Sequence, residues 1–106
     1  MLCEPIDMEL VFEWDSSKAR MNLQKHKVTF EEARTLFNDP LLLTYPDESH
    51  SQTEERCISI GSSVRNRVLV VVHTEREEIE DTLTIRIISC RKATASERRA
   101  YEESNE

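Results

Sequence analysis

The residues whose types and spacing suggest chemistry are concentrated near the carboxyl end of the sequence, in residues 84–101 (TIRIISCRKATASERRAY). A β-branched run leads there to the basic pair Arg91 and Lys92, and the signal for a helix follows. Thr94 and Glu97 have the spacing of a capping box, in which each side chain binds a free backbone amide of the first helical turn. Cations at the end of a strand, just before a helix begins, can hold a phosphate group. Many α+β domains end in the same way without such a site, so both interpretations stay open.

His73 and Glu75 form a second candidate pair, on the strand predicted for residues 67–75. Alternation along this strand places both side chains on one face near its end. A histidine changes its charge near neutral pH, so His73 can move a proton while Glu75 orients the ring. The alternative is a half-buried strand histidine with a hydrogen-bond partner. His26 has the same ambiguity, because it lies on the apolar side of a predicted helix.

The last predicted strand, residues 82–91, carries two further arginines. Alternation places Arg86 on the face opposite Ile85 and Ile87. It places Arg91 on the same face as the two isoleucines, unless a bulge intervenes. The pattern alone therefore does not bring Arg86 and Arg91 together.

The length and composition indicate one globular domain, residues 9–106, preceded by a flexible arm of residues 1–8. The chain has 106 residues, of which 38% are hydrophobic and 33% charged, as in ordinary soluble domains. Its longest apolar run, residues 68–72, is far shorter than the roughly 20 residues of a membrane helix. Its first residues do not form a secretion signal. We therefore expect a cytoplasmic protein that does not contact a membrane.

The cysteines and the remaining motifs indicate neither a metal nor another cofactor. Cys3, Cys57 and Cys90 have none of the spacings of metal sites. Their odd number, without a secretion signal, is typical of reduced thiols. The sequence contains no Ser-His-Asp spacing and no glycine-rich phosphate loop.

The net charge of −7 argues against nucleic-acid binding, because phosphate contacts normally require a basic surface. The distribution of the charge weakens that objection. Apart from the acidic residues 75–81, the span from residue 56 to residue 99 carries eight cations and one acid, Glu97. The sequence therefore allows a basic face on an acidic body. The alternative is that these arginines are solvated residues at strand edges, just as Lys18 and Lys25 are most simply solvated helix residues.

The hydrophobic pattern predicts an α+β domain with the order strand, two helices, four strands and a helix. Asp15 caps the first helix, and Thr29 with Glu32 has capping-box spacing at the start of the second. Arg65 and Asn66 form the expected tip of a hairpin. The apolar stripe of the first helix is Ala19, Leu23 and His26. The predicted strands cover residues 9–14, 41–45, 56–62, 67–75 and 82–91, with helices at 15–26, 29–38 and from 94, and a polar loop at 46–54.

Several segments of the sequence resemble BrnT-type toxins of type II toxin–antitoxin pairs. These segments are FEWD (12–15), KHKVTFEEA (25–33), RVLVVVHTER (67–76) and IRIISCRKAT (85–94). The resemblance covers residues 12–101, nearly the whole chain. It implies a RelE-like fold: a curved antiparallel sheet of four to five strands, two N-terminal helices packed on one face, and a C-terminal helix.

The resemblance also implies a function. It implies a metal-independent endoribonuclease that cleaves RNA through attack by the 2′-OH group and inhibits translation. A BrnA-type antitoxin would neutralise it, with a toxin dimer within a heterotetramer, and operator DNA would be contacted only through that complex. The alternative is a non-catalytic interaction module that acts with its antitoxin in repression of the operon.

The roles of individual residues follow from the same resemblance. The catalytic set is Arg76, Arg86 and Arg91 as ligands of the phosphate and its transition state, with Glu75 and His73 for proton transfer. Arginine suits this role because its planar fork matches two phosphate oxygens and its charge does not titrate. The expected RNA-binding residues are Lys25, His26, Arg67 and Lys92. The assignment of base and acid stays open, and the hypothesis requires the three arginines to converge in one shallow hollow.

Three positions depart from the family pattern. Lys27 stands where the family has glycine after the KH pair, so the first helix needs a different cap or a strained end. Asn66 replaces a hairpin glycine. Residues 75–81 form a longer and more acidic loop than the short turn of the family, close to the expected site.

Overall fold

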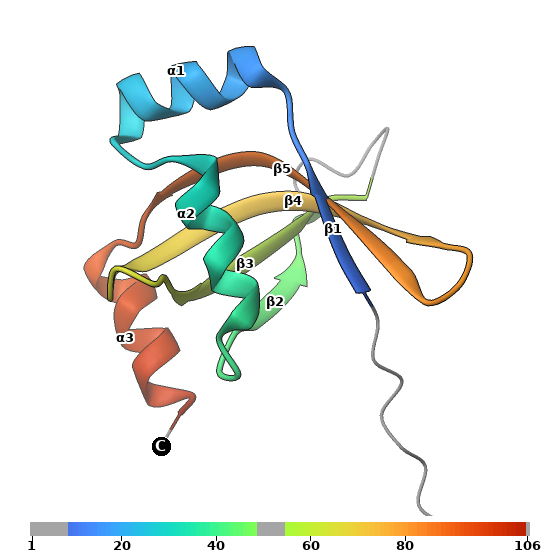
Figure 1. Ribbon diagram of the computed structural model, residues 1–106. Coiled ribbons are helices and arrows are strands. Elements are labelled where there is room, and N and C mark those ends of the chain that lie inside the picture. Colours follow the sequence, from blue (N-terminus) through green and yellow to red (C-terminus); the bar gives the residue numbers. More distant parts are fainter. Residues whose placement is uncertain (1–8, 49–54, 106) are drawn as a thin grey trace, which may run out of the picture.

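The computed structural model describes residues 9–48 and 55–105. The predicted arm of residues 1–8 and the larger part of the predicted polar loop lie outside these residues. Figure 1 shows a twisted sheet with helices packed against it. In chain order the elements are β1 (Glu9–Glu13), α1 (Ser16–His26), α2 (Phe30–Arg34), η1 (Thr35–Asn38), β2 (Leu43–Pro46), β3 (Cys57–Ser62), β4 (Val68–Glu78), β5 (Thr82–Lys92) and α3 (Ala95–Glu103). None of the helices in the described ranges is long and apolar enough to cross a membrane.

The sheet has five strands in the order β1-β5-β4-β3-β2. Neighbouring strands from β2 to β5 are antiparallel, as predicted, whereas β1 runs parallel to β5. The prediction of a wholly antiparallel sheet was therefore wrong, and the fold is α+β with a mixed sheet. The reason is connectivity: hairpin-like connections force β2 to β5 to alternate in direction, whereas β1 leads into helices, which leave its direction free.

Two apolar clusters fill the two faces of the sheet. The larger joins α2 to β4 and β5, and its buried members include Phe30, Leu69 and Ile85. Val70, of opposite parity to Leu69, belongs to a smaller cluster that contains Tyr101 of α3. Because successive strand residues point to opposite faces, α2 and α3 cover opposite faces of the sheet.

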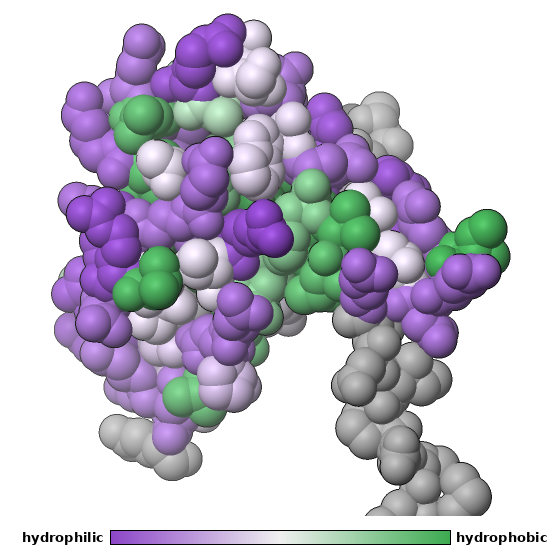
Figure 2. Space-filling view, viewed as in Figure 1, coloured by the Kyte–Doolittle hydropathy of each residue, from purple (hydrophilic) through white to green (hydrophobic). Residues whose placement is uncertain are grey.

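The surface on the side of α1 and α2 is mostly hydrophilic (Figure 2). Apolar side chains gather there beside β1 and at the tip of the β4–β5 hairpin, where Ile79 is 87% exposed. This hairpin corrects a prediction, because residues 75–81 do not form one loop. Strand β4 continues to Glu78, and a turn with positive φ at Glu80 and Asp81 closes the hairpin.

The helix and turn ends follow the local signals of the sequence. Asp15 caps α1 by accepting two backbone N–H groups of the first turn. Lys27 takes the left-handed conformation itself, with φ 59°, and its N–H bonds back into the last turn, so α1 ends in a left-handed cap made without glycine. Asn66 adopts φ 61° in the hairpin between β3 and β4. Thr94 and Glu97 form both halves of the predicted capping box of α3.

A bulge in β5 resets the direction of its side chains. The register with β4 shifts between Val72 and His73 and leaves Ile88 as the extra residue of β5. An extra residue shifts the alternation of a strand by one position. Arg86 and Arg91 therefore lie on the same face of the sheet, the face that α3 covers in part, and the exception that the sequence analysis allowed for is present.

Asn22 joins α1 to the edge of β5. Strand β1 pairs with β5 only as far as Arg86, and beyond that point the described residues supply no strand to this edge. The buried side-chain amide of Asn22 binds the backbone of β5 there, as a neighbouring strand would. It accepts the N–H of Cys90 at 3.0 Å and donates to the carbonyls of Cys90 at 2.8 Å and Val28 at 3.0 Å. The predicted apolar stripe of α1 was wrong here, since Leu23 is exposed and the polar Asn22 makes the contact.

We expect Asn22→Ala to lower the free energy of unfolding by about 3 kcal/mol, because it leaves buried backbone groups of Cys90 and Val28 without partners. Gln24→Ala, at an exposed position of the same helix, is the matched control and should change it by less than about 0.5 kcal/mol. Urea unfolding followed by circular dichroism measures both variants. Equal stability of the two variants would contradict the proposed role of Asn22.

Candidate functional site

A hollow of about 470 Å³ lies between α1 and the edge of β5. Lys18, Lys25 and His26 of α1 contribute to its lining, together with Ile88 and Ser89 of β5. No acidic residue is among its lining residues. We call it the α1–β5 hollow.

Helix spacing and the strand bulge build this hollow. Lys18, Asn22 and Lys25 follow one another at i, i+4 and i+7, so they share one side of α1, and the Asn22 hydrogen bonds hold that side against β5. Lys25 and His26 lie in the last turn of α1, where the partial negative charge of the helix end favours cations. The bulged residue Ile88 lines the opposite side.

Among the described residues, the side chains of Lys18, Lys25 and His26 have no hydrogen-bond or ion-pair partner. The charge of Lys18 acts on the Asp15 carboxylate, which is not among the lining residues. Lysines that gather around a concave surface raise the local potential and attract anions. In the described ranges no group of three or more His, Cys, Asp or Glu side chains has the geometry to hold a metal ion. The charge of the two lysines therefore favours an anion in this hollow, with the His26 ring among its lining residues.

Arg76 and Arg86 meet at one carboxylate near the β4–β5 hairpin. Arg86 donates to Glu13 Oε2 at 2.9 Å, and Arg76 donates to Glu13 Oε1 at 3.3 Å. Arg76 also donates to Glu78 at 3.0 Å. Arg86 is paired with Glu13 in the sheet, so it lies near the start of α1. The hydrogen bonds that the Asp15 carboxylate accepts from the backbone N–H groups of Lys18 and Ser17 lower its pKa, and the charges of Lys18 and Arg86 lower it further.

Arg91 forms a separate pair with Glu97 of α3. Its two terminal nitrogens donate to the two carboxylate oxygens at 2.7 and 2.8 Å. The Arg91 guanidinium, with the Thr94 N–H, lowers the pKa of Glu97 to about 2. Arg86 and Arg91 face β4 residues four positions apart, which is about 13 Å along a strand. The structure therefore brings Arg76 and Arg86 together, keeps Arg91 apart from them, and ties each of the three to a carboxylate. The expectation that the three arginines converge in one shallow hollow was therefore wrong.

His73 lies in the core, beneath Phe37, with ring centroids 5.0 Å apart. Its Nε2 is 2.7 Å from the Ser59 hydroxyl, which is 2.7 Å from the Thr44 hydroxyl. Its Nδ1 has no hydrogen-bond partner, and the nearest Glu75 oxygen is 3.6 Å away. Burial lowers the pKa of His73 to about 4 and raises that of Glu75. A fully buried neutral ring does not touch a ligand, so His73 acts on one only through Glu75.

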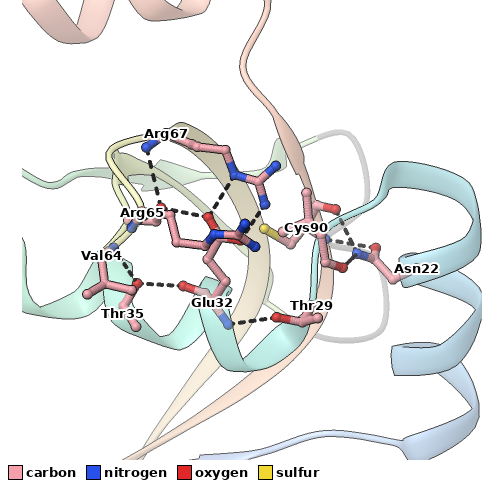
Figure 3. A network of polar contacts seen from close by, with 10 residues as sticks. Asn22, Thr29, Glu32, Thr35, Val64, Arg65, Arg67 and Cys90 are labelled. Carbon is pink, nitrogen blue, oxygen red and sulfur yellow. Dashed lines mark hydrogen bonds and ion pairs between the residues drawn. The ribbon is translucent and has the colours of Figure 1, made fainter.

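Glu32 lies at the centre of the polar network in Figure 3. Its carboxylate accepts two hydrogen bonds from Arg67 and one from Ser63, with Arg65 at 3.9 Å. The predicted capping box of α2 is therefore only half formed. Thr29 accepts the Glu32 N–H at 3.1 Å, but the Glu32 carboxylate turns to Arg67, which lowers the pKa of Glu32.

The predicted site residues thus occupy separate places. These are Lys25 and His26 in the α1–β5 hollow; Arg76, Arg86 and Glu75 near the β4–β5 hairpin; Arg91 beside α3; His73 in the core; and Arg67 and Lys92 at a second hollow. Lys18 and Ser89 also line the α1–β5 hollow, and neither was predicted as a site residue from the sequence. The seven-residue spacing from Lys18 to Lys25 was a signal for the first, whereas the place of Ser89 depends on the bulge.

The fold and the site define a small α+β protein with a surface hollow lined by lysine, histidine and uncharged side chains. The model of the ribonuclease toxin family BrnT, of type II toxin–antitoxin systems, matches residues 14–97, so the chain belongs to this family. The resemblance to BrnT-type toxins is thereby confirmed. A 1.1 Å crystal structure of the ribonuclease toxin BrnT of Brucella abortus is similar, with a TM-score of 0.56 and 19% identity over 83% of this chain and 99% of that chain. At this identity the similarity supports the fold. A comparison with curated proteins found no match.

We expect the stability of the protein to fall between about pH 6.5 and about pH 4, because an unfolded histidine binds a proton in this range while His73 stays neutral. The pKa of His73 is lower in the folded protein than in the unfolded chain. The stability that the neutral ring contributes is therefore fully present above the unfolded pKa, and it is lost as the pH falls to the folded pKa. The loss amounts to about 3 kcal/mol. Urea unfolding at several pH values should show a shallower dependence for His73→Gln than for His26→Gln, the control. Parallel curves for the two variants would contradict the prediction.

Proposed function

We propose that the protein is an endoribonuclease toxin that cleaves RNA in the cytoplasm and thereby inhibits translation. The observation that carries the proposal is the α1–β5 hollow, where Lys18, Lys25 and His26 stand together without an ion-pair partner among the described residues. The family is described as a ribonuclease toxin, and phosphodiester cleavage is a reaction that such a hollow suits. The activity resides in the single domain of residues 9–106, with a RelE-like arrangement of sheet and helices as its frame.

Attack by the 2′-OH requires a base for its proton, positive charge for the phosphorane, and an acid for the leaving 5′-oxygen. None of these steps needs a metal ion. Lys18 and Lys25 supply the positive charge beside the phosphate. His26 is the imidazole of the hollow, and imidazole is the side chain most often used for general acid–base catalysis, so we assign it the proton transfer, either from the 2′-OH or to the 5′-oxygen.

In this proposal the predicted arginines bind the RNA phosphate after they release their glutamate partners. Arg86 and Arg91 stand on the same strand as the hollow, and their side chains are 41% and 42% exposed. A phosphate offers the same pair of oxygens as a carboxylate, so each fork can pass from its glutamate to RNA. Arg76 assists through the carboxylate that it shares with Arg86. Glu75, positioned by the buried His73, is a further candidate for proton transfer.

A type II toxin acts together with an antitoxin, and we infer a BrnA-type antitoxin as the partner of this chain. The family assignment supports an antitoxin partner. The proposed complex contains a toxin dimer within a heterotetramer and reaches operator DNA only through the antitoxin. The acidic hairpin of residues 75–81 complements a basic antitoxin segment.

A second candidate function is a non-catalytic interaction module that serves its antitoxin and operon repression. The ion pairs of Arg76, Arg86 and Arg91 favour it, because all three predicted transition-state ligands already have carboxylate partners. In this case the exposed cations bind a partner protein and the hollow has no reaction to perform.

We expect Lys25→Ala and His26→Ala to reduce the cleavage rate of purified protein on RNA at least about 100-fold, since each removes a charge or a proton-transfer group from the reacting phosphate. Arg20→Ala, an exposed cation of α1 outside the hollow, is the matched control and should cleave at the wild-type rate. Unfolding midpoints verify that the variants are folded. Wild-type rates for both Lys25→Ala and His26→Ala would exclude the hollow as the active site.

Expression of the wild-type protein with and without its antitoxin separates the two functions. The ribonuclease proposal predicts growth arrest and fragmented RNA without the partner, and cleavage in vitro that persists in the presence of a chelator. Unimpaired growth and intact RNA would instead establish the interaction module.

A further inference from the structure

A second hollow of about 430 Å³ lies where the β3–β4 hairpin, the end of β5 and α3 meet. Each of these segments contributes one cation to its lining: Arg67, Lys92 and Arg98. Glu102 is the single acidic residue of its lining. Because α3 contributes Arg98 and Glu102, we call it the α3 hollow.

Arg67 is the one of these three cations whose side chain is held in place by hydrogen bonds to a carboxylate. The buried Glu32 carboxylate accepts two of its five N–H groups (Figure 3), and the other three remain for a ligand. Its side chain is 26% exposed. The pair therefore holds a guanidinium rigidly at the wall of the hollow while part of it stays accessible.

Lys92 and Arg98 are the uncompensated members. Neither side chain has a hydrogen-bond or ion-pair partner among the described residues. This distinguishes them from Arg76, Arg86 and Arg91, each of which already binds a carboxylate. Cations that share a hollow repel one another, and an anion bound between them converts that repulsion into attraction.

The two hollows lie along one strand. Ser89 lines the α1–β5 hollow and Lys92 lines the α3 hollow, and the two residues are about 10 Å apart along β5 at the usual rise of a strand. Their side chains leave opposite faces of the sheet, so an RNA strand that contacts both hollows passes around the edge of β5 that β1 leaves open. Arg91 lies between them in the strand but is paired with Glu97. A short stretch of single-stranded RNA is flexible enough to follow this path, so one strand can place two of its phosphates in the two hollows.

We propose that the α3 hollow binds a backbone phosphate of the same RNA strand whose scissile phosphodiester occupies the α1–β5 hollow. The inference rests on the proposed function for the identity of the ligand and extends it with a binding site away from the reaction. It makes Lys92 and Arg98 determinants of affinity for long RNA and leaves the chemical step to the α1–β5 hollow.

The test measures binding without cleavage. A fluorescent 2′-O-methyl oligonucleotide lacks the attacking hydroxyl, so its anisotropy reports affinity alone. We expect Lys92→Ala with Arg98→Ala to weaken binding about tenfold and to lower the slope of log affinity against log salt by about 0.7 for each phosphate that the variant no longer neutralises. Arg20→Ala with Arg99→Ala removes two charges at exposed positions outside both hollows, and this control should keep the wild-type affinity.

Unchanged RNA affinity in the Lys92→Ala, Arg98→Ala variant would overturn the proposal, and so would equal decreases in variant and control. The α3 hollow could instead bind free inorganic phosphate, which carries the same kind of charged oxygens as the RNA backbone. If phosphate shifts the amide signals of Lys92 and Arg98 while the variant binds the oligonucleotide like the wild type, the hollow takes the free ion and the RNA assignment fails. A decrease in affinity for the antitoxin with RNA affinity intact would likewise overturn it.

A second readout separates this inference from the proposed function. On long RNA, which reaches both hollows, the KM of the variant should rise, and this rise should be much smaller on a dinucleotide, which cannot reach both hollows. Absence of cleavage by the wild-type protein would remove the proposed function, and the anisotropy measurement would still decide whether the α3 hollow binds RNA.

Discussion

The change in the pairing of β5 along its length is the constraint on which the rest of the structure depends. Strand β1 covers its first half and stops at Arg86. Beyond this point the edge needs another partner, because unpaired backbone groups in a buried position are costly. The side-chain amide of Asn22 is that partner, through its hydrogen bonds to the backbone of Cys90. The bulge at Ile88 lies between the part of β5 that pairs with β1 and the part that binds Asn22. A continuous β1 would close the α1–β5 hollow, and a regular β5 would send Arg91 to the other face.

The distribution of charge explains how an acidic chain can have two hollows lined mainly by basic side chains. The β4–β5 hairpin carries carboxylates on residues 75, 77, 78, 80 and 81, with Arg76 as its cation. The two hollows use cations from the opposite end of β5 and from the helices beside it. At physiological ionic strength a field is screened over about 8 Å, so carboxylates at the far end of the hairpin have little effect on either hollow. The net charge of −7 therefore describes the solubility of the molecule better than its binding surfaces.

Most of the fold could be predicted from the sequence, because helix caps and strand patterns depend on neighbouring residues. The wrong predictions concern features that depend on contacts between residues far apart in the chain. The cap at Asp15 and the box of Thr94 and Glu97 depend on residues within one turn, and both were predicted. Glu32 had equally good local spacing, but a partner 35 positions away, Arg67, takes its carboxylate. No residue pattern marks the bulge at Ile88, so alternation alone predicted Arg91 on the wrong face and could only name a bulge as an exception. The direction of β1 depends on which sheet edge remains open, which no stretch of sequence encodes.

If the proposed function holds, the partner that each cation has before RNA binds sets the order in which contacts form. A phosphate that approaches Arg91 has to displace Glu97, which binds the guanidinium through two hydrogen bonds of 2.7 and 2.8 Å. Lys18 and Lys25 have no ion-pair partner in the described structure, so a phosphate gains their attraction without this cost. The proposal therefore has the lysines bind the RNA strand first. With a phosphate held beside Ser89, the exchange at Arg91 takes place within one complex, which is far more favourable than the same exchange from solution. The ion pairs of the arginines are thus compatible with a later role in the proposed reaction.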